Sequence, residues 1–249
     1  MGSGKYSALA GAISREQRLA NIATNLANVN TIGYKKSRMS FESLLRGEQQ
    51  TDRAKGINYS RVRENFTDFT EGSIRETGNP LDIAIYGDGF FKVQSPDGTR
   101  YTRRGDFHTA QDGTLLTGNN MPVLDSGNAP ILIPDTNTSK ISVNSLGEVS
   151  ILSIDGTRNV VGTIAIYTIN DNKNLTRESD TLFSLKEDGQ EILQREPNLA
   201  VGSLEMSNVN ITEEMALMIE STRTFESYQK VIKAYSALGQ KQDELGTIG

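Results

Sequence analysis

The stretch Arg18-Leu-Ala-Asn-Ile-Ala-Thr-Asn-Leu-Ala-Asn-Val-Asn-Thr-Ile-Gly-Tyr-Lys-Lys36 decides how this chain is organised. Its apolar residues Leu19, Ile22, Leu26 and Val29 recur at steps of three and four, which predicts one apolar stripe along an α-helix. A helix of this kind gains most of its stability by covering the stripe, so we expect it to have a partner.

The partner predicted for this helix lies at the other end of the chain. Asn210 with Glu213 three residues later resembles a capping box, which marks a helix start, and Gly239 allows a break after Leu238. One face of this second helix is apolar and consists of Ile211, Met215, Met218, Ile219, Phe225 and Ile232. We therefore expect the two ends to pair antiparallel in a coiled-coil-like domain, with the middle of the chain looped out between them.

The first helix is expected over residues 5–29, ending before Gly33, which can take the left-handed conformation after a helix. Upstream of the quoted stretch its seam continues through Tyr6, Leu9 and Ile13. A polar stripe formed by Asn21, Asn25 and Asn28 runs beside the apolar one. It is either a solvated face or a ladder of amides that bond across to a neighbouring helix and fix its register. The tripeptide Asn28-Val-Asn30 recurs as Asn208-Val-Asn210, where the second helix begins.

Residues 34–63 form a basic segment within an acidic protein. They contain three acidic residues and eight basic ones: Lys35, Lys36, Arg38, Arg46, Arg53, Lys55, Arg61 and Arg63. Phe41, Leu44 and Leu45 fit a short helical turn, and a polar run follows from Gly47. The segment is either a solvated, flexible connector or a basic layer that lies against acidic neighbouring subunits.

Residues 75–206 carry the signals of strands. Short apolar runs such as residues 83–86 and 90–93 alternate with Asp-Gly pairs, which favour hairpin turns. These pairs occur at Asp97-Gly98, Asp112-Gly113, Asp155-Gly156 and Asp188-Gly189, beside Gly87-Asp-Gly89. The pattern predicts an α+β protein whose middle is an antiparallel barrel-like or sandwich domain. We divide the chain into residues 1–33 with 207–249, a connector 34–74, and a β-rich domain 75–206.

Composition excludes several function classes. The 249 residues carry a net charge of −5, which gives no general attraction to nucleic acid, and they include no cysteine. No apolar run approaches the ~20 residues that span a bilayer, and no cleaved signal peptide is expected. His108 is the only histidine, and we find no metal, cofactor or catalytic motif.

Three blocks of this sequence resemble the flagellar rod and hook proteins. The first is residues 23–35, in which Thr24 replaces an asparagine and Tyr34 a phenylalanine of the family's usual pattern. The second is residues 78–93, continued by 101–107, and the third begins at Ser207-Asn-Val-Asn210. The resemblance implies an axial structural protein that is exported unfolded by the flagellar type III apparatus and polymerises with copies of itself and with other rod proteins.

The resemblance also implies a role for both helices as the inner tube of the rod, in the periplasmic space. The residues expected to make subunit contacts are Leu19, Ile22, Asn25, Leu26, Asn28, Val29, Asn30, Gly33, Asn208, Val209, Asn210, Met215, Met218, Ile219, Phe225 and Ile232. Length and the first 12 residues are most similar to proximal-rod members, whereas residues 41–45 are similar to distal-rod members. A hook-type axial protein is a further alternative, although hook proteins normally carry an additional outer domain for which this sequence lacks the length. An enzyme built on His108 and a monomeric periplasmic binding or adhesion module are the alternatives from other classes.

Overall fold

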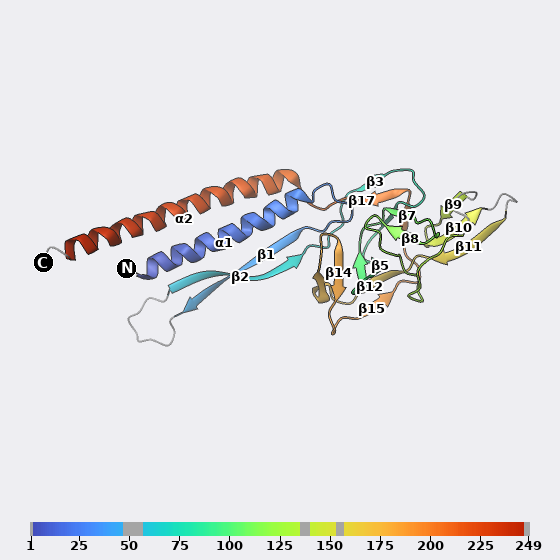
Figure 1. The fold of residues 1–249 in the computed structure, drawn as a ribbon, viewed down its shortest axis with the longest axis horizontal. Coiled ribbons are helices and arrows are strands. Elements are labelled where there is room, and N and C mark those ends of the chain that lie inside the picture. The colour runs from blue at the N-terminus through green and yellow to red at the C-terminus, as the bar shows by residue number, and fades with distance from the viewer. Residues whose placement is uncertain (1, 47–56, 135–139, 153–156, 247–249) are drawn as a thin grey trace. The chain divides into compact units, whose positions relative to one another are not determined.

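The computed structural model describes residues 2–46, 57–134, 140–152 and 157–246. The chain divides into two compact units (Figure 1). The helical unit comprises Met1–Ala27, Ser37–Asp68 and Asn210–Gly249, and the β unit comprises Asn28–Lys36 and Phe69–Val209. The protein is therefore of the α+β class, with helices at its two ends and strands between them, as the sequence predicts.

The helical unit contains α1 (Gly2–Ala27) and α2 (Ile211–Gly246), which lie side by side and antiparallel (Figure 1). Asn210 caps α2, because its side-chain oxygen accepts from the backbone N–H of Thr212 at 3.0 Å and of Glu213 at 3.2 Å. The break expected after Leu238 is wrong, since α2 continues through Gly239 to Gly246. A single glycine costs a helix only about 1 kcal/mol, and the good helix formers around it outweigh that cost.

The segment between α1 and the β unit forms a long hairpin within the helical unit. Strands β1 (Ser37–Arg46) and β2 (Ile57–Thr67) pair antiparallel, with one register shift after Ser40. The short helical turn predicted for residues 41–45 is therefore wrong, because ten residues of cross-strand pairing override local preference. The polar run at 47–56 lies outside the described residues.

All strand pairs of the β unit are antiparallel, over the part of the chain that the structure describes. Its largest sheet has six strands in the order β13-β14-β6-β5-β12-β15 and curls into a half-barrel. The smaller sheets are β11-β10-β9, β16-β4, β17-β3 and β7-β8. The strands are β3 (Ile74–Glu76), β4 (Ile83–Ile85), β5 (Phe90–Ser95), β6 (Gly98–Thr102), β7 (Phe107–Thr109), β8 (Leu115–Thr117), β9 (Lys140–Val143), β10 (Glu148–Leu152), β11 (Arg158–Thr163), β12 (Ile166–Ile169), β13 (Leu175–Arg177), β14 (Leu182–Leu185), β15 (Glu191–Leu193), β16 (Leu199–Val201) and β17 (Ser203–Glu205).

The Asp-Gly pairs differ in whether they lie at a hairpin turn. The chain turns between β5 and β6 at Pro96-Asp97, with Gly98 paired to Ser95 as the first residue of β6, and Gly98 and Gly113 take positive φ. Asp188-Gly189 is not a hairpin turn, because the flanking strands β14 and β15 pair with other strands. Asp155-Gly156 lies outside the described residues.

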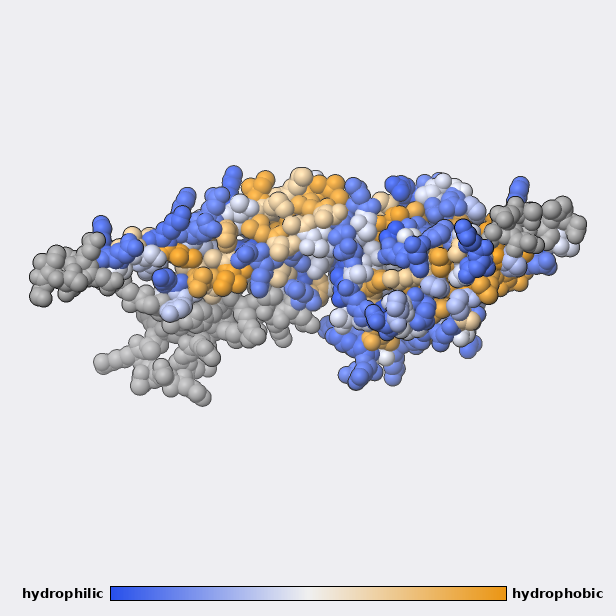
Figure 2. Space-filling model, in the orientation of Figure 1, coloured by the Kyte–Doolittle hydropathy of each residue, from blue (hydrophilic) through white to orange (hydrophobic). Residues whose placement is uncertain are grey.

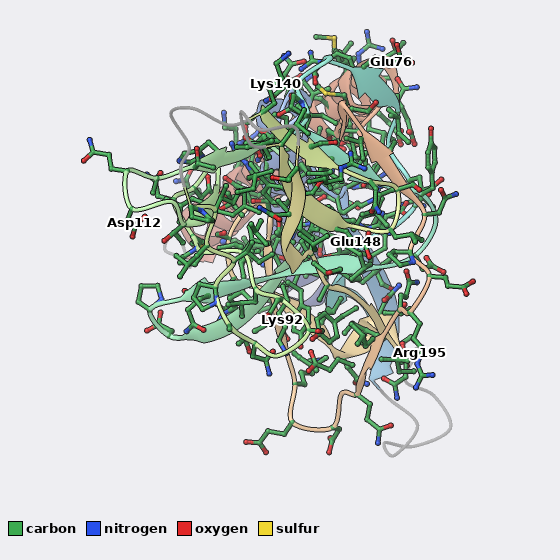
Figure 3. The ribbon with its side chains drawn as sticks, turned by 90° about the vertical axis from the view of Figure 1, so that its right-hand side faces the viewer. Glu76, Lys92, Asp112, Lys140, Glu148 and Arg195 are labelled. Carbon is green, nitrogen blue, oxygen red and sulfur yellow. The ribbon has the colours of Figure 1, made fainter. Side chains whose placement is uncertain are left out.

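Two apolar clusters form the interior of the β unit. The larger one contains residues of β4, β5, β7, β8, β9, β10, β12 and β16, and the smaller one includes Phe90, Tyr101, Tyr167 and Phe183. Lys92 is buried beside the smaller cluster, with its ammonium 2.7 Å from Glu191 and 4.7 Å from the centre of the Tyr167 ring. Figure 3 labels Lys92 among the packed side chains, in contrast to Asp112, which points outward.

Candidate subunit-contact surface

Two glycines of α1 pack against two tyrosines of α2. A Cβ atom added to Gly4 would lie 2.6 Å from the Tyr235 hydroxyl oxygen, and one added to Gly11 would lie 2.6 Å from the Tyr228 ring. Gly4 and Gly11 are seven positions apart along α1, and Tyr228 and Tyr235 are seven positions apart along α2. At these two places the helices therefore meet through a glycine of α1 and a tyrosine ring of α2.

This seam turns three large apolar residues of α1 away from α2. Tyr6, Leu9 and Ile13 are 63%, 45% and 46% exposed. The prediction that they continue the covered seam is wrong, because Gly4 and Gly11, which have no side chain, and the buried Ala8 and Ala12 let the two helices approach along a different face. Of the expected stripe further along, Ile22 is buried, whereas Leu19, Leu26 and Val29 are half-buried.

A second uncovered apolar stripe lies on α2. Ile211, Met215 and Ile219 follow one another at steps of four and are 45%, 54% and 55% exposed. Figure 2 shows hydrophobic side chains gathered over this first half of α2. The remaining predicted residues of this face, Met218, Phe225 and Ile232, are half-buried. A stripe of large apolar side chains at helical spacing marks a surface that contacts another protein or a membrane.

The asparagines of α1 do not form a solvated face. Asn25 is 1% exposed, and its amide donates to the Ser37 carbonyl at 3.0 Å and to Glu214 on α2 at 3.3 Å. Its side-chain oxygen accepts from the Ser37 N–H at 2.9 Å, and Asn21 donates to the Ser37 hydroxyl at 2.9 Å. Asn25 thus fixes α2 and the start of β1 against α1, so one member of the predicted amide ladder does reach a neighbouring helix.

The chain after α1 enters the β unit through a group of buried charges. The Lys35 ammonium lies 2.6 Å from Glu205, and the other carboxylate oxygen of Glu205 lies 3.3 Å from the Arg103 guanidinium. All three side chains are almost fully buried. Burial lowers the pKa of Lys35 below its ordinary value, and attraction to the Glu205 carboxylate opposes this shift. We call Lys35, Arg103 and Glu205 the charge clasp.

Backbone contacts complete the charge clasp. Lys35 donates to the Thr70 carbonyl at 2.7 Å, Arg103 donates to the Gly87 carbonyl at 2.6 Å, and the Gly72 N–H donates to Glu205 at 3.0 Å. Gly33 has a φ of 68°, and its N–H donates to the Glu205 carbonyl at 2.8 Å.

The basic segment is therefore not wholly a solvated connector. Lys35 and Lys36 are buried in the β unit, and Arg38 pairs with Asp68 at 2.7 Å. Sequence reasoning missed the charge clasp, because its members stand far apart in the chain and only the fold brings them together.

The other predicted contact residues lie where the chain passes between helix and strand. Asn28 is buried and donates to Asp180 at 3.4 Å, and the Asn208 side chain accepts from the Lys36 N–H at 2.6 Å. Val209 is buried, whereas Asn30 and Asn210 are exposed.

The structure offers little to the alternative functions. His108 is exposed on β7, and its strand neighbours are apolar or hydroxyl residues. Among the described residues, no group of three or more acidic or histidine side chains could hold a metal ion. The same residues contain no helix that is long and apolar enough to span a membrane.

Comparison with known proteins identifies the class. Residues 84–151 match the family model of the flagellar hook protein FlgE/F/G D1 domain, and residues 200–245 match that of the flagellar basal body rod FlgEFG protein C-terminal region. The flagellar basal-body rod protein FlgG of Bacillus subtilis is 35% identical over 91% of this chain and 92% of its own. The rod proteins FlgF of Mesorhizobium japonicum, over 98% and 97%, and of Caulobacter vibrioides, over 100% of both chains, are each 32% identical.

These matches define an axial structural protein of the bacterial flagellum and not an enzyme. The chain belongs to the FlgF/FlgG family of flagellar basal-body rod proteins. It is a structural subunit of the rod and is located in the flagellar basal body, where it assembles with other rod components.

Proposed function

We propose that this chain is a subunit of the proximal rod, of the FlgF type. The FlgF relatives align with it over nearly their whole length, whereas the FlgG relative leaves 8% of its own length and 9% of this chain unmatched. In this role the subunits build the helical drive shaft that transmits torque from motor to hook and surrounds the export channel. A distal-rod role of the FlgG type is the second candidate, favoured by the 35% identity to that relative.

The uncovered apolar stripes of α1 and α2 carry this proposal. Apolar side chains on two faces of one helix pair fit a heterologous interface, in which each copy covers the next and the contact repeats without closing. Met215 and Ile219 would be buried by a neighbouring subunit, with Leu19, Leu26 and Phe225 at the margins of the contact. The buried residues Ile22, Asn25, Asn28, Gly33 and Val209 would act by fixing the shape of that surface, and Val29, Asn30, Asn208, Asn210, Met218 and Ile232 complete the proposed contact set.

The helix pair would form the coiled-coil-like inner layer of the rod. The seven-residue spacing of the Gly–Tyr contacts supports this arrangement. In the assembled rod, residues 1–33 with 207–249 would form the inner tube, residues 34–74 a bridging layer, and residues 75–206 the outer layer.

The proposal also includes how the chain is exported to the rod. We expect the flagellar type III apparatus to export the chain without cleavage of a signal peptide, into the periplasmic part of the basal body.

A pair of aspartate substitutions tests the proposal. Ile219→Asp places a charge in the apolar stripe, so we expect loss of swimming and of basal bodies that carry a rod. Ser227→Asp, at an exposed position about two turns further along the same helix and between Arg223 and Lys230, is the matched control and should assemble. A swimming Ile219→Asp strain would contradict the proposal that neighbouring subunits cover this stripe.

A further inference from the structure

The first and last strands of the β unit pair with each other. Strand β17 pairs with β3, and β16 pairs with β4, so the last strands of the unit are the partners of the first. The charge clasp lies at the same closure, since Glu205 belongs to β17 and its partner Lys35 stands 170 residues earlier in the chain.

One carboxylate, that of Glu205, forms ion pairs with both cations of the clasp, while Glu71 adds a smaller attraction to Lys35. Lys35 and Arg103 are both cations with almost no exposure, and Glu205 is the only acidic side chain with a described hydrogen bond to either of them. Burial of a cation without its partner is strongly unfavourable, because the loss of hydration is not compensated. The segment that carries Lys35 cannot dock stably in the β unit until Glu205 is present.

The larger apolar cluster extends to the same closure. It contains Ile83 and Ile85 from β4 and Leu199 from β16, next to residues of the intervening strands. Contacts between segments this far apart form late in folding, since the chain entropy lost on closing a long loop must be compensated first.

From these contacts we infer that the charge clasp is a folding checkpoint: the β unit acquires its core only when residues 33–36 and residues 199–209 are both free to meet. The relevance to assembly rests on the proposed export function. While either of these two segments is still held inside an export channel, the β unit stays unfolded, so it acquires its core only after the second segment has emerged. The order in which the ends emerge does not matter, because each end is required.

Pulse-labelled hydrogen exchange during refolding of the intact chain tests the inference. Three amides report on the core: Leu115 donates to Ile131, Val123 to Leu115, and Ile131 to Val123. Two report on the closure, since Gly33 and Gly72 donate to the backbone and the side chain of Glu205. We expect both sets to gain protection in one kinetic phase. Protection of the three core amides in an earlier phase would overturn the inference.

A matched pair of variants separates the clasp from a general loss of charge. Glu205→Gln should slow formation of the protected core roughly tenfold, since the buried cations lose their counter-charge. Glu196→Gln makes the same chemical change at an exposed position and should refold as the wild type. Core protection at the wild-type rate in Glu205→Gln would overturn the checkpoint. Neither outcome depends on rod assembly, so motility assays of the stripe variants test the proposed function separately.

Discussion

Tyr228 on α2 packs directly over Gly11 on α1, at a place where any side chain larger than hydrogen would meet the tyrosine ring. Seven residues along each helix, Tyr235 meets Gly4 in the same way. The tyrosines therefore supply the apolar contact of the seam, and glycine lets the helix axes approach. Leu9 and Ile13 of α1 stay exposed, and we propose that other subunits cover them.

Gly11→Val should weaken the pairing of the two helices. The added methyl groups would overpack against Tyr228, which costs about 1–3 kcal/mol in a close-packed contact. Thermal unfolding followed by far-UV circular dichroism measures the effect on helix content. Gly239→Val is the matched control, since nothing lies within 4 Å of a Cβ at that helical glycine. Equal midpoints for the two variants would contradict the seam.

Gly33→Ala should destabilise the β unit more than Gly78→Ala. Both glycines have positive φ, 68° and 77°, so each alanine costs about 1–2 kcal/mol for the left-handed backbone. A Cβ at Gly33 would also lie 2.5 Å from the backbone nitrogen of Arg104, whereas a Cβ at Gly78 would meet nothing within 4 Å. Urea unfolding followed by tyrosine fluorescence should place the Gly33→Ala midpoint clearly lower. The opposite order would show that Gly33 is not tightly enclosed.

Tyr101→Phe should change the stability of the β unit at alkaline pH. Burial, then the hydrogen bond to Glu191, raises the pKa of Tyr101 above its ordinary value of 10.0. Above pH 10 the unfolded chain loses this proton and the folded chain keeps it, so wild-type stability falls as pH rises. The variant lacks the group and should lose less stability between pH 9 and about 11 in urea titrations. Parallel pH profiles for the two proteins would contradict a raised pKa.

The sequence predicted the order of helices and strands along this protein better than it predicted which residues contact one another. Helical periodicity at both ends and turn-rich strands between them were sufficient for the α+β class, because these patterns depend on local sequence. The hairpin β1–β2 was not predictable in this way, since its long strands are stabilised by pairing with each other.

The same contrast holds for the candidate contact surface, where local spacing identified some residues and others meet only through the fold. Met215 and Ile219 were identified from spacing alone, and they are exposed as a contact surface requires. Periodicity could not tell which apolar face of α1 would be covered, because Gly4 and Gly11 carry no hydrophobic signal although the partner packs against them. The charge clasp left no local trace either, since Lys35 and Glu205 meet only through the fold.

The most direct test measures burial of the α2 stripe in the rod itself. The chain contains no cysteine, so Ile219→Cys introduces a single thiol, and His108→Cys supplies an exposed reference in the β unit. Labelling with a membrane-impermeant maleimide is compared between the free subunit and purified basal bodies. We predict that the thiol at position 219 reacts in the free subunit and is protected in basal bodies. Equal labelling of position 219 in both states would contradict the claim that neighbouring subunits cover this stripe.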